Sequence, residues 1–140
     1  MKTRILSVVL VGLALTLLFL PGGQAQAGIQ PVLVVDNVFT AISSGDVDTA
    51  VSAFAEDAVV ENSVRNETYV GTEEIRQVLQ AMQRERRQFD IVWVEMIGDT
   101  ITFSVEISDR GIAWGLQTFQ AEIKDGKVKN LETQGVRLTF

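Results

Sequence analysis

Two segments of the sequence decide the fold: residues 39–62, FTAISSGDVDTAVSAFAEDAVVEN, and residues 69–79, YVGTEEIRQVL. In the first, an apolar helical stripe ends at Gly45, and Asp46 is a residue type that caps the start of a second helix. We expect that helix to end near residues 56–57. Residues 58–62, which follow it, are rich in valine and predict a short strand, and residues 65–71 predict a polar loop. The second segment repeats apolar residues at three- and four-residue spacing, which predicts a third helix.

The sequence on either side completes the pattern. Residues 31–42 carry the apolar stripe of the first helix, and from Phe89 onward the apolar period changes to two. Short turns separate the strands predicted at residues 89–97, 100–108, 112–123 and 128–140. Hairpin-linked strands are antiparallel. We therefore expect an α+β fold in which three N-terminal helices pack on a strongly curved, mainly antiparallel sheet around an apolar cavity.

The first 27 residues have the organisation of a secretory signal peptide. Lys2 and Arg4 precede residues 5–20, which carry no charge, and Ala25-Gln26-Ala27 is a small-x-small cleavage sequence. An uncleaved membrane anchor is the alternative, but a spanning helix needs about 20 apolar residues. We predict cleavage after Ala27, a secreted or periplasmic location, no membrane association after cleavage, and one domain formed by residues 28–140.

Composition excludes several classes of function. The chain has 140 residues with no His and no Cys, which excludes imidazole or thiol catalysis and most zinc sites. Its 18 acidic residues outnumber the 12 basic ones, which argues against a nucleic-acid partner. We expect no metal and no cofactor.

The phrases FTAISSGDVDTAVSAFAED, AVVEN and YVGTEEIRQVL together resemble the nuclear-transport-factor-two-like superfamily. That group includes the SnoaL-like polyketide cyclases, the steroid delta-isomerases and the limonene epoxide hydrolases. The resemblance covers residues 31–140 and implies a cone-shaped, cystatin-like α+β barrel. It is weak evidence for an activity, because this fold carries many functions.

The resemblance also implies which positions to inspect for catalysis. Steroid delta-isomerases have an Asp general base at the position of Asn62, a Tyr near Val38 and a protonated Asp near Leu116. An amide cannot take a proton near neutral pH, and the other two side chains are apolar. The Asp-Arg-Asp network of limonene epoxide hydrolase has no match. These departures favour a protein that is not an acid–base enzyme, with Glu61 and Tyr69 as the weak catalytic candidates.

Strand alternation predicts the lining of the cavity, with few polar groups. Asn62 either orients a ligand carbonyl or bonds to the adjacent backbone. We expect Arg84, Arg86 and Arg87 to stabilise the end of the third helix and not to form an anion site. The residues predicted to line the ligand pocket are Phe54, Asn62, Tyr69, Met82, Phe103, Val105, Trp114, Leu116, Thr118, Leu131 and Thr133.

Phe119, Ala121 and Ile123 alternate onto the face opposite Trp114. Either a bulge switches the faces, or the outer side of the sheet carries an apolar patch, and such patches mark association surfaces. The patch and the resemblance both favour a homodimer through the outer sheet face.

Three functions remain open. The first is an exported domain that binds a small, mostly apolar molecule without transforming it. The second is an isomerase, cyclase or dehydratase with an unconventional acid such as Glu61 or Tyr69. The third is a protein-association module.

Overall fold

The computed structural model describes residues 24–138, so most of the predicted signal peptide, residues 1–27, lies outside the described residues. Three helices and six strands make up this part of the chain. The helices are α2 (Gln24–Ser44), α3 (Val47–Ser52) and α4 (Gly71–Arg84). The strands are β1 (Phe54–Asn62), β2 (Glu67–Val70), β3 (Gln88–Ile97), β4 (Thr100–Asp109), β5 (Ile112–Lys124) and β6 (Lys127–Leu138).

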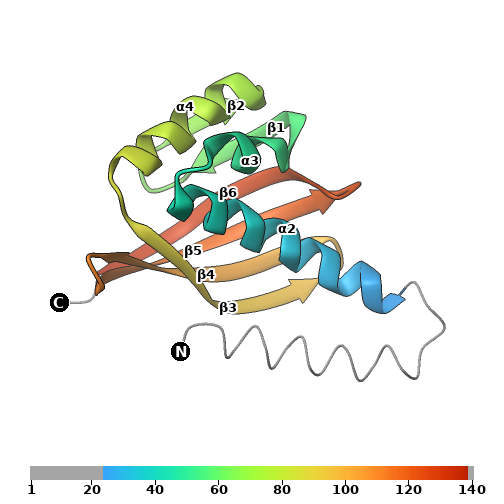
Figure 1. Cartoon of the computed structure of the whole chain (residues 1–140). Helices are drawn as coiled ribbons and strands as arrows, with labels where there is room; N and C mark the ends of the chain where they lie inside the picture. Colours follow the sequence, from blue (N-terminus) through green and yellow to red (C-terminus); the bar gives the residue numbers. More distant parts are fainter. Residues whose placement is uncertain (1–23, 139–140) are drawn as a thin grey trace.

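The strands form one mixed sheet in the order β2-β1-β6-β5-β4-β3. Every neighbouring pair is antiparallel except β1 and β6, which run parallel. Figure 1 shows the sheet bending around the three helices, which lie on one side of it. The α+β prediction is confirmed, although β2 and β3 are free edges and the sheet does not close into a barrel. No helix within residues 24–138 has the length and apolar character needed to cross a membrane.

The junction between α3 and β1 differs from the prediction. Asp46 caps α3 as expected, since its carboxylate accepts a hydrogen bond from the backbone N of Thr49 at 3.1 Å. The helix, expected to reach residues 56–57, ends at Ser52. Pairing with β6 has drawn the following residues into the sheet, with Phe54 opposite Val128. Pairing with β1 likewise turns part of the predicted polar loop, residues 65–71, into β2.

An aromatic cluster joins α2 to the middle of the sheet. Phe39 lies 5.6 Å from Phe103 and 5.2 Å from Phe119 between ring centroids, and the last two rings stack at 5.4 Å. All three side chains are buried. This cluster fixes the inner face of β4 and β5 against the long helix.

A bulge in β5 decides which side chains face inward. Ile107 pairs with Gly115 but Ser108 pairs with Ala113, so Trp114 is an extra residue on β5. Beyond it the odd-numbered residues face the helices, and Phe119, Ala121 and Ile123 are all buried. The prediction of a bulge that switches the faces is therefore confirmed. The alternative prediction, an apolar patch of these three residues on the outer face, is wrong.

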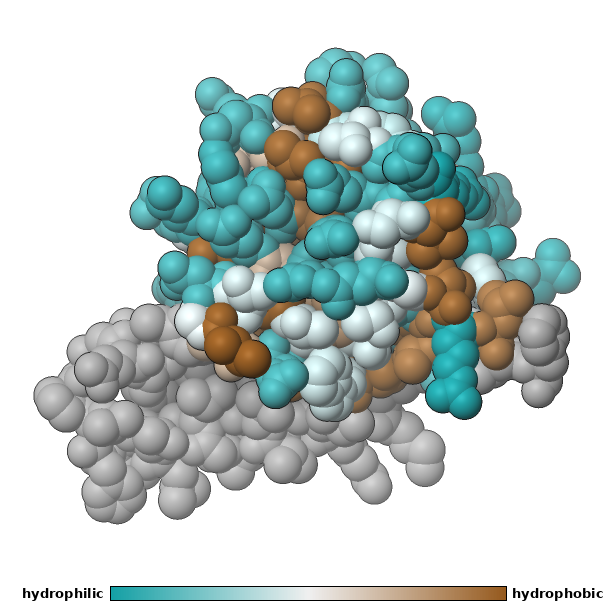
Figure 2. All heavy atoms as spheres, turned by 180° about the vertical axis from the view of Figure 1, so that it is seen from behind, coloured by the Kyte–Doolittle hydropathy of each residue, from teal (hydrophilic) through white to brown (hydrophobic). Residues whose placement is uncertain are grey.

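The outer face is accordingly mixed in character. Figure 2, which views the molecule from behind, shows hydrophilic side chains over much of it and hydrophobic ones in several separate groups. Gln134 donates to Gln120, and Asn130 donates to Glu122 at 2.8 Å, across β5 and β6. The homodimer through this face therefore stays a prediction, and Phe119, Ala121 and Ile123 are not part of the proposed interface.

Candidate functional site

A pocket of about 470 Å³ lies between the helices and the concave face of the sheet. This volume falls within the range of small-molecule sites. Side chains from α2, α4 and the sheet line it, and most are apolar. The apolar lining includes Val38, Phe39, Ile42, Phe54, Val60, Ile75, Leu79, Met82, Phe89, Ile107, Phe119 and Leu131.

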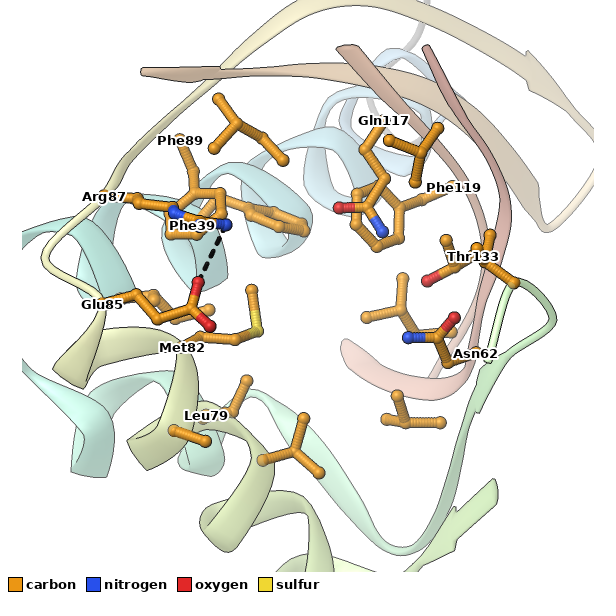
Figure 3. Close-up of a pocket in the computed structure, with 18 of the residues that line it drawn as sticks. Phe39, Asn62, Leu79, Met82, Glu85, Arg87, Phe89, Gln117, Phe119 and Thr133 are labelled. Atoms are coloured by element: carbon orange, nitrogen blue, oxygen red, sulfur yellow. Dashed lines mark ion pairs between the residues drawn. The ribbon is translucent and has the colours of Figure 1, made fainter. Parts of the chain in front are cut away.

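Three uncharged polar side chains share one wall of this pocket. Asn62 of β1 lies beside Thr133 of β6, because the two residues are register partners in the parallel pair. Gln117 of β5 comes two residues before Phe119, which pairs with Thr133. Figure 3 shows all three on the same side of the cavity. Three adjacent strands thus converge on one polar wall.

Hydrogen bonding fixes the orientation of Asn62. Its Oδ1 accepts from the backbone N of Arg65 at 3.1 Å, so the backbone-bonding alternative is present in the structure. The Nδ2 group of Asn62 points into the pocket in Figure 3. Among the described residues, Gln117 and Thr133 have no side-chain hydrogen-bond partner, although Thr133 is only 5% exposed. The wall therefore has unused hydrogen-bonding capacity.

An ion pair stands on the opposite side of the pocket. Arg87 lies 2.9 Å from the Glu85 carboxylate (Figure 3). Its guanidinium carbon lies 4.2 Å from the centre of the Trp114 ring. The helix ends at Arg84, so Arg87 is not in its last turn as predicted. The chain turns at Arg86, where φ is +55°, and this turn brings Arg87 to the pocket.

The two weak catalytic candidates lie in different places. Tyr69 lines the pocket, and its hydroxyl donates to Glu67 at 2.8 Å. This hydrogen bond to Glu67 is the main cause that raises the pKa of Tyr69 above 10.0, which makes the phenol a weaker acid. Glu61 is exposed and lines a shallow groove on the outer face with Glu122 and Glu132.

The structure separates the predicted pocket residues into three groups. Phe54, Asn62, Tyr69, Met82, Trp114, Leu131 and Thr133 line the pocket. Phe103 and Val105 do not, because both are fully buried in the core. Leu116 and Thr118 lie on the outer face, because the bulge at Trp114 shifts the alternation by one residue.

Sequence reasoning missed Gln117, Glu85 and Arg87. Gln117 is followed at odd-numbered positions by the apolar residues Phe119, Ala121 and Ile123. This alternation could have indicated that the Gln117 side chain faces inward. No sequence pattern marked the turn after α4 that directs Arg87 to the pocket. Within residues 24–138, no three acidic side chains lie close enough to hold a metal ion.

Comparisons with known proteins agree with this architecture. A family model for the SnoaL-like domain matches residues 35–131. A candidate polyketide cyclase from Sinorhizobium meliloti shares 27% identity at a TM-score of 0.63, covering 72% of this chain and 93% of that one. A search of curated proteins gave no match.

Two more distant structures share the fold alone. A cystatin-fold protein from Novosphingobium aromaticivorans is 20% identical at a TM-score of 0.64, covering 75% and 97% of the two chains. A candidate ketosteroid isomerase from Kribbella flavida is 16% identical at a TM-score of 0.63, covering 74% and 76%. The superfamily and the fold predicted from the sequence are confirmed.

Proposed function

The chain belongs to the SnoaL-like domain family, and we propose that it is an exported domain that binds a small, mostly apolar molecule without acid–base catalysis. The pocket of about 470 Å³ carries this proposal, since apolar side chains from helices and sheet form most of its lining. Burial of an apolar ligand there would be driven by the hydrophobic effect.

The polar groups of the pocket argue for binding over catalysis. General acid–base catalysis needs a titratable group within hydrogen-bond reach of the reacting atom. The described carboxylates of the lining, Glu67 and Glu85, are exposed, and each already has a partner in Tyr69 or Arg87. Asn62 lines the pocket, and the resemblance to the isomerases implies that it takes the position of their base, but its amide cannot take a proton near neutral pH.

Native mass spectrometry of the exported protein tests the binding proposal. The wild-type protein should carry a co-purifying small molecule. Met82→Trp, which fills the pocket from α4, should lose it. The matched control Met96→Trp, at an exposed position near the end of β3, should keep it. Repeated recovery of an empty wild-type protein would contradict the proposal.

Export rests on the N-terminal sequence. Cleavage after Ala27 should yield a mature chain that begins at Gly28, and its intact mass checks this directly. Since α2 begins at Gln24, cleavage there would shorten this helix by about one turn. Recovery of the full-length chain from the exported fraction would refute cleavage.

An enzyme of the isomerase, cyclase or dehydratase type is the second candidate. The hydrogen-bonded Tyr69–Glu67 pair at the pocket favours it. Tyr69→Phe should abolish turnover of any substrate found, whereas Glu61→Gln on the outer face should not change it. Unchanged turnover in Tyr69→Phe would remove this candidate acid.

A homodimer through the outer sheet face is the remaining proposal. Sedimentation of the mature domain should show a dimer. Gln120→Lys would then weaken it, because this side chain lies on the outer face beside Gln134. A monomer at all concentrations would end this proposal.

A further inference from the structure

The polar wall of the pocket points to the class of ligand, and this inference rests on the proposed binding function. We propose that the pocket selects an apolar molecule that carries an uncharged amide-type group, which Asn62, Thr133 and Gln117 bind. The apolar part of the ligand would then contact Leu79 and Met82 of α4.

The hydroxyl of Thr133, which opens onto the pocket, is the observation that carries this inference. Burying a polar group without a hydrogen bond is unfavourable, and buried polar groups in folded proteins almost always have partners. Thr133 is 95% buried as a residue and has no partner among the described residues, and its hydroxyl faces the pocket in Figure 3. No side-chain oxygen or nitrogen of the described residues is both buried and unpaired, so this hydroxyl is accessible from the pocket. A ligand that fills the pocket would bury it and must therefore offer it a hydrogen-bond partner.

Its neighbours define the chemistry of that partner. The Oδ1 of Asn62 accepts from the backbone N of Arg65, and the Nδ2 donors are the atoms that face the pocket in Figure 3. Gln117 and Thr133 each offer both a donor and an acceptor. An amide presents a carbonyl and an N–H side by side, so it can accept from Asn62 while it exchanges hydrogen bonds with Gln117 or Thr133.

The wall also argues against a charged ligand group. None of the three side chains carries a charge, and a buried charge needs an opposite charge to offset its desolvation. Arg87 stands across the pocket, and Glu85 already neutralises it at 2.9 Å. A carboxylate at the polar wall would have no cation there.

The test compares three two-ring probes of similar size. These are tetralin, which is apolar, 3,4-dihydro-2(1H)-quinolinone, which is a cyclic amide, and 2-naphthoate, which is a carboxylate. Binding is followed by the fluorescence of Trp114 in a Trp93→Phe background, because Trp93 is exposed and Trp114 lines the pocket. Gln117→Met removes polar atoms from the wall, and Gln120→Met makes the same change on the outer face of β5.

In the wild type we expect the cyclic amide to bind more tightly than 2-naphthoate. Gln117→Met should weaken cyclic-amide binding about tenfold, as expected for two lost hydrogen bonds, and change tetralin binding less than about twofold. Thr133→Val should have the same selective effect, which provides a second test if Gln117→Met folds poorly. Gln120→Met should leave the affinities for both probes unchanged.

Two outcomes would overturn the inference while leaving the binding function intact. One is a loss in Gln117→Met and Thr133→Val that is equal for tetralin and the cyclic amide. The other is tighter binding of 2-naphthoate than of the cyclic amide to the wild type. Failure of all three probes to bind would instead overturn the proposed function together with this inference.

Discussion

Replacement of Thr133 by valine should stabilise the empty domain. The two side chains have nearly the same shape, so Thr133→Val removes the hydroxyl and little else. That hydroxyl is in a side chain that is 5% exposed, and it makes no hydrogen bond within the described residues. The hydroxyl is accessible only from the pocket, so in the empty protein it is partly desolvated and no protein hydrogen bond offsets this cost.

The cost of a fully buried, unpaired hydroxyl sets the upper bound of the magnitude. Protein substitutions place this cost at about 1–3 kcal/mol, and contact of the hydroxyl with the pocket reduces it. We expect Thr133→Val to raise the free energy of unfolding by about 1 kcal/mol. For a domain of this size that corresponds to an increase in Tm of about 4 °C.

Thr118→Val is the matched control, because it makes the same chemical change on the outer face of the sheet. The Thr118 hydroxyl lies 3.3 Å from the Ser104 hydroxyl, and Ser104 is 8% exposed. Removal of this partner leaves a buried hydroxyl unpaired and should lower the free energy of unfolding by about 1 kcal/mol. The two substitutions should thus have opposite signs.

Urea unfolding of the ligand-free protein, followed by circular dichroism, measures both differences. The slope m should stay unchanged, so that shifts in midpoint report stability alone. A loss of stability in Thr133→Val as large as in Thr118→Val would show that the Thr133 hydroxyl has a structural role. It would refute the argument that this group is held ready for a ligand.

Three further predictions concern the rest of the domain. Burial, and secondly the nearby Asp90, raise the pKa of Asp36 above 3.8, so its charged form destabilises the fold. Asp36→Asn should therefore raise the urea midpoint at pH 7, and this gain should disappear as the pH falls below 3.8, where the wild-type carboxyl is protonated in both states. Phe103→Ala should lower the free energy of unfolding by about 3–5 kcal/mol in the same urea assay, whereas Ile112→Ala, at a position 73% exposed, should change it little. Arg87→Met should cost no more than about 1 kcal/mol, because the ion pair with Glu85 is partly exposed, and calorimetry at low and high salt should show the loss shrinking as salt is added.

Much of the fold was predictable because the decisive contacts are local. The helical stripe ending at Gly45 and the Asp46 cap define the break between α2 and α3. The period-two pattern after Phe89 defines four strands joined by short turns. In each case neighbours in the sequence determine the backbone conformation, so periodicity and capping were sufficient evidence.

The site was less predictable because it depends on partners distant in sequence. Residues 65–71 became partly β2 only through pairing with β1. Arg87 reached the pocket only because the chain turns at Arg86 after the helix. Neither event leaves a periodic pattern in the sequence.

By itself, the sequence determined the family, the types of most elements and the neutral residue at Asn62. The tertiary structure alone decided which side of β5 faces the pocket. One extra residue at Trp114 moves Leu116 and Thr118 outward and Gln117 inward, because side chains alternate across a strand with a period of two. The position of a bulge is set by the strand that pairs beside it, and that pairing exists only in the folded sheet.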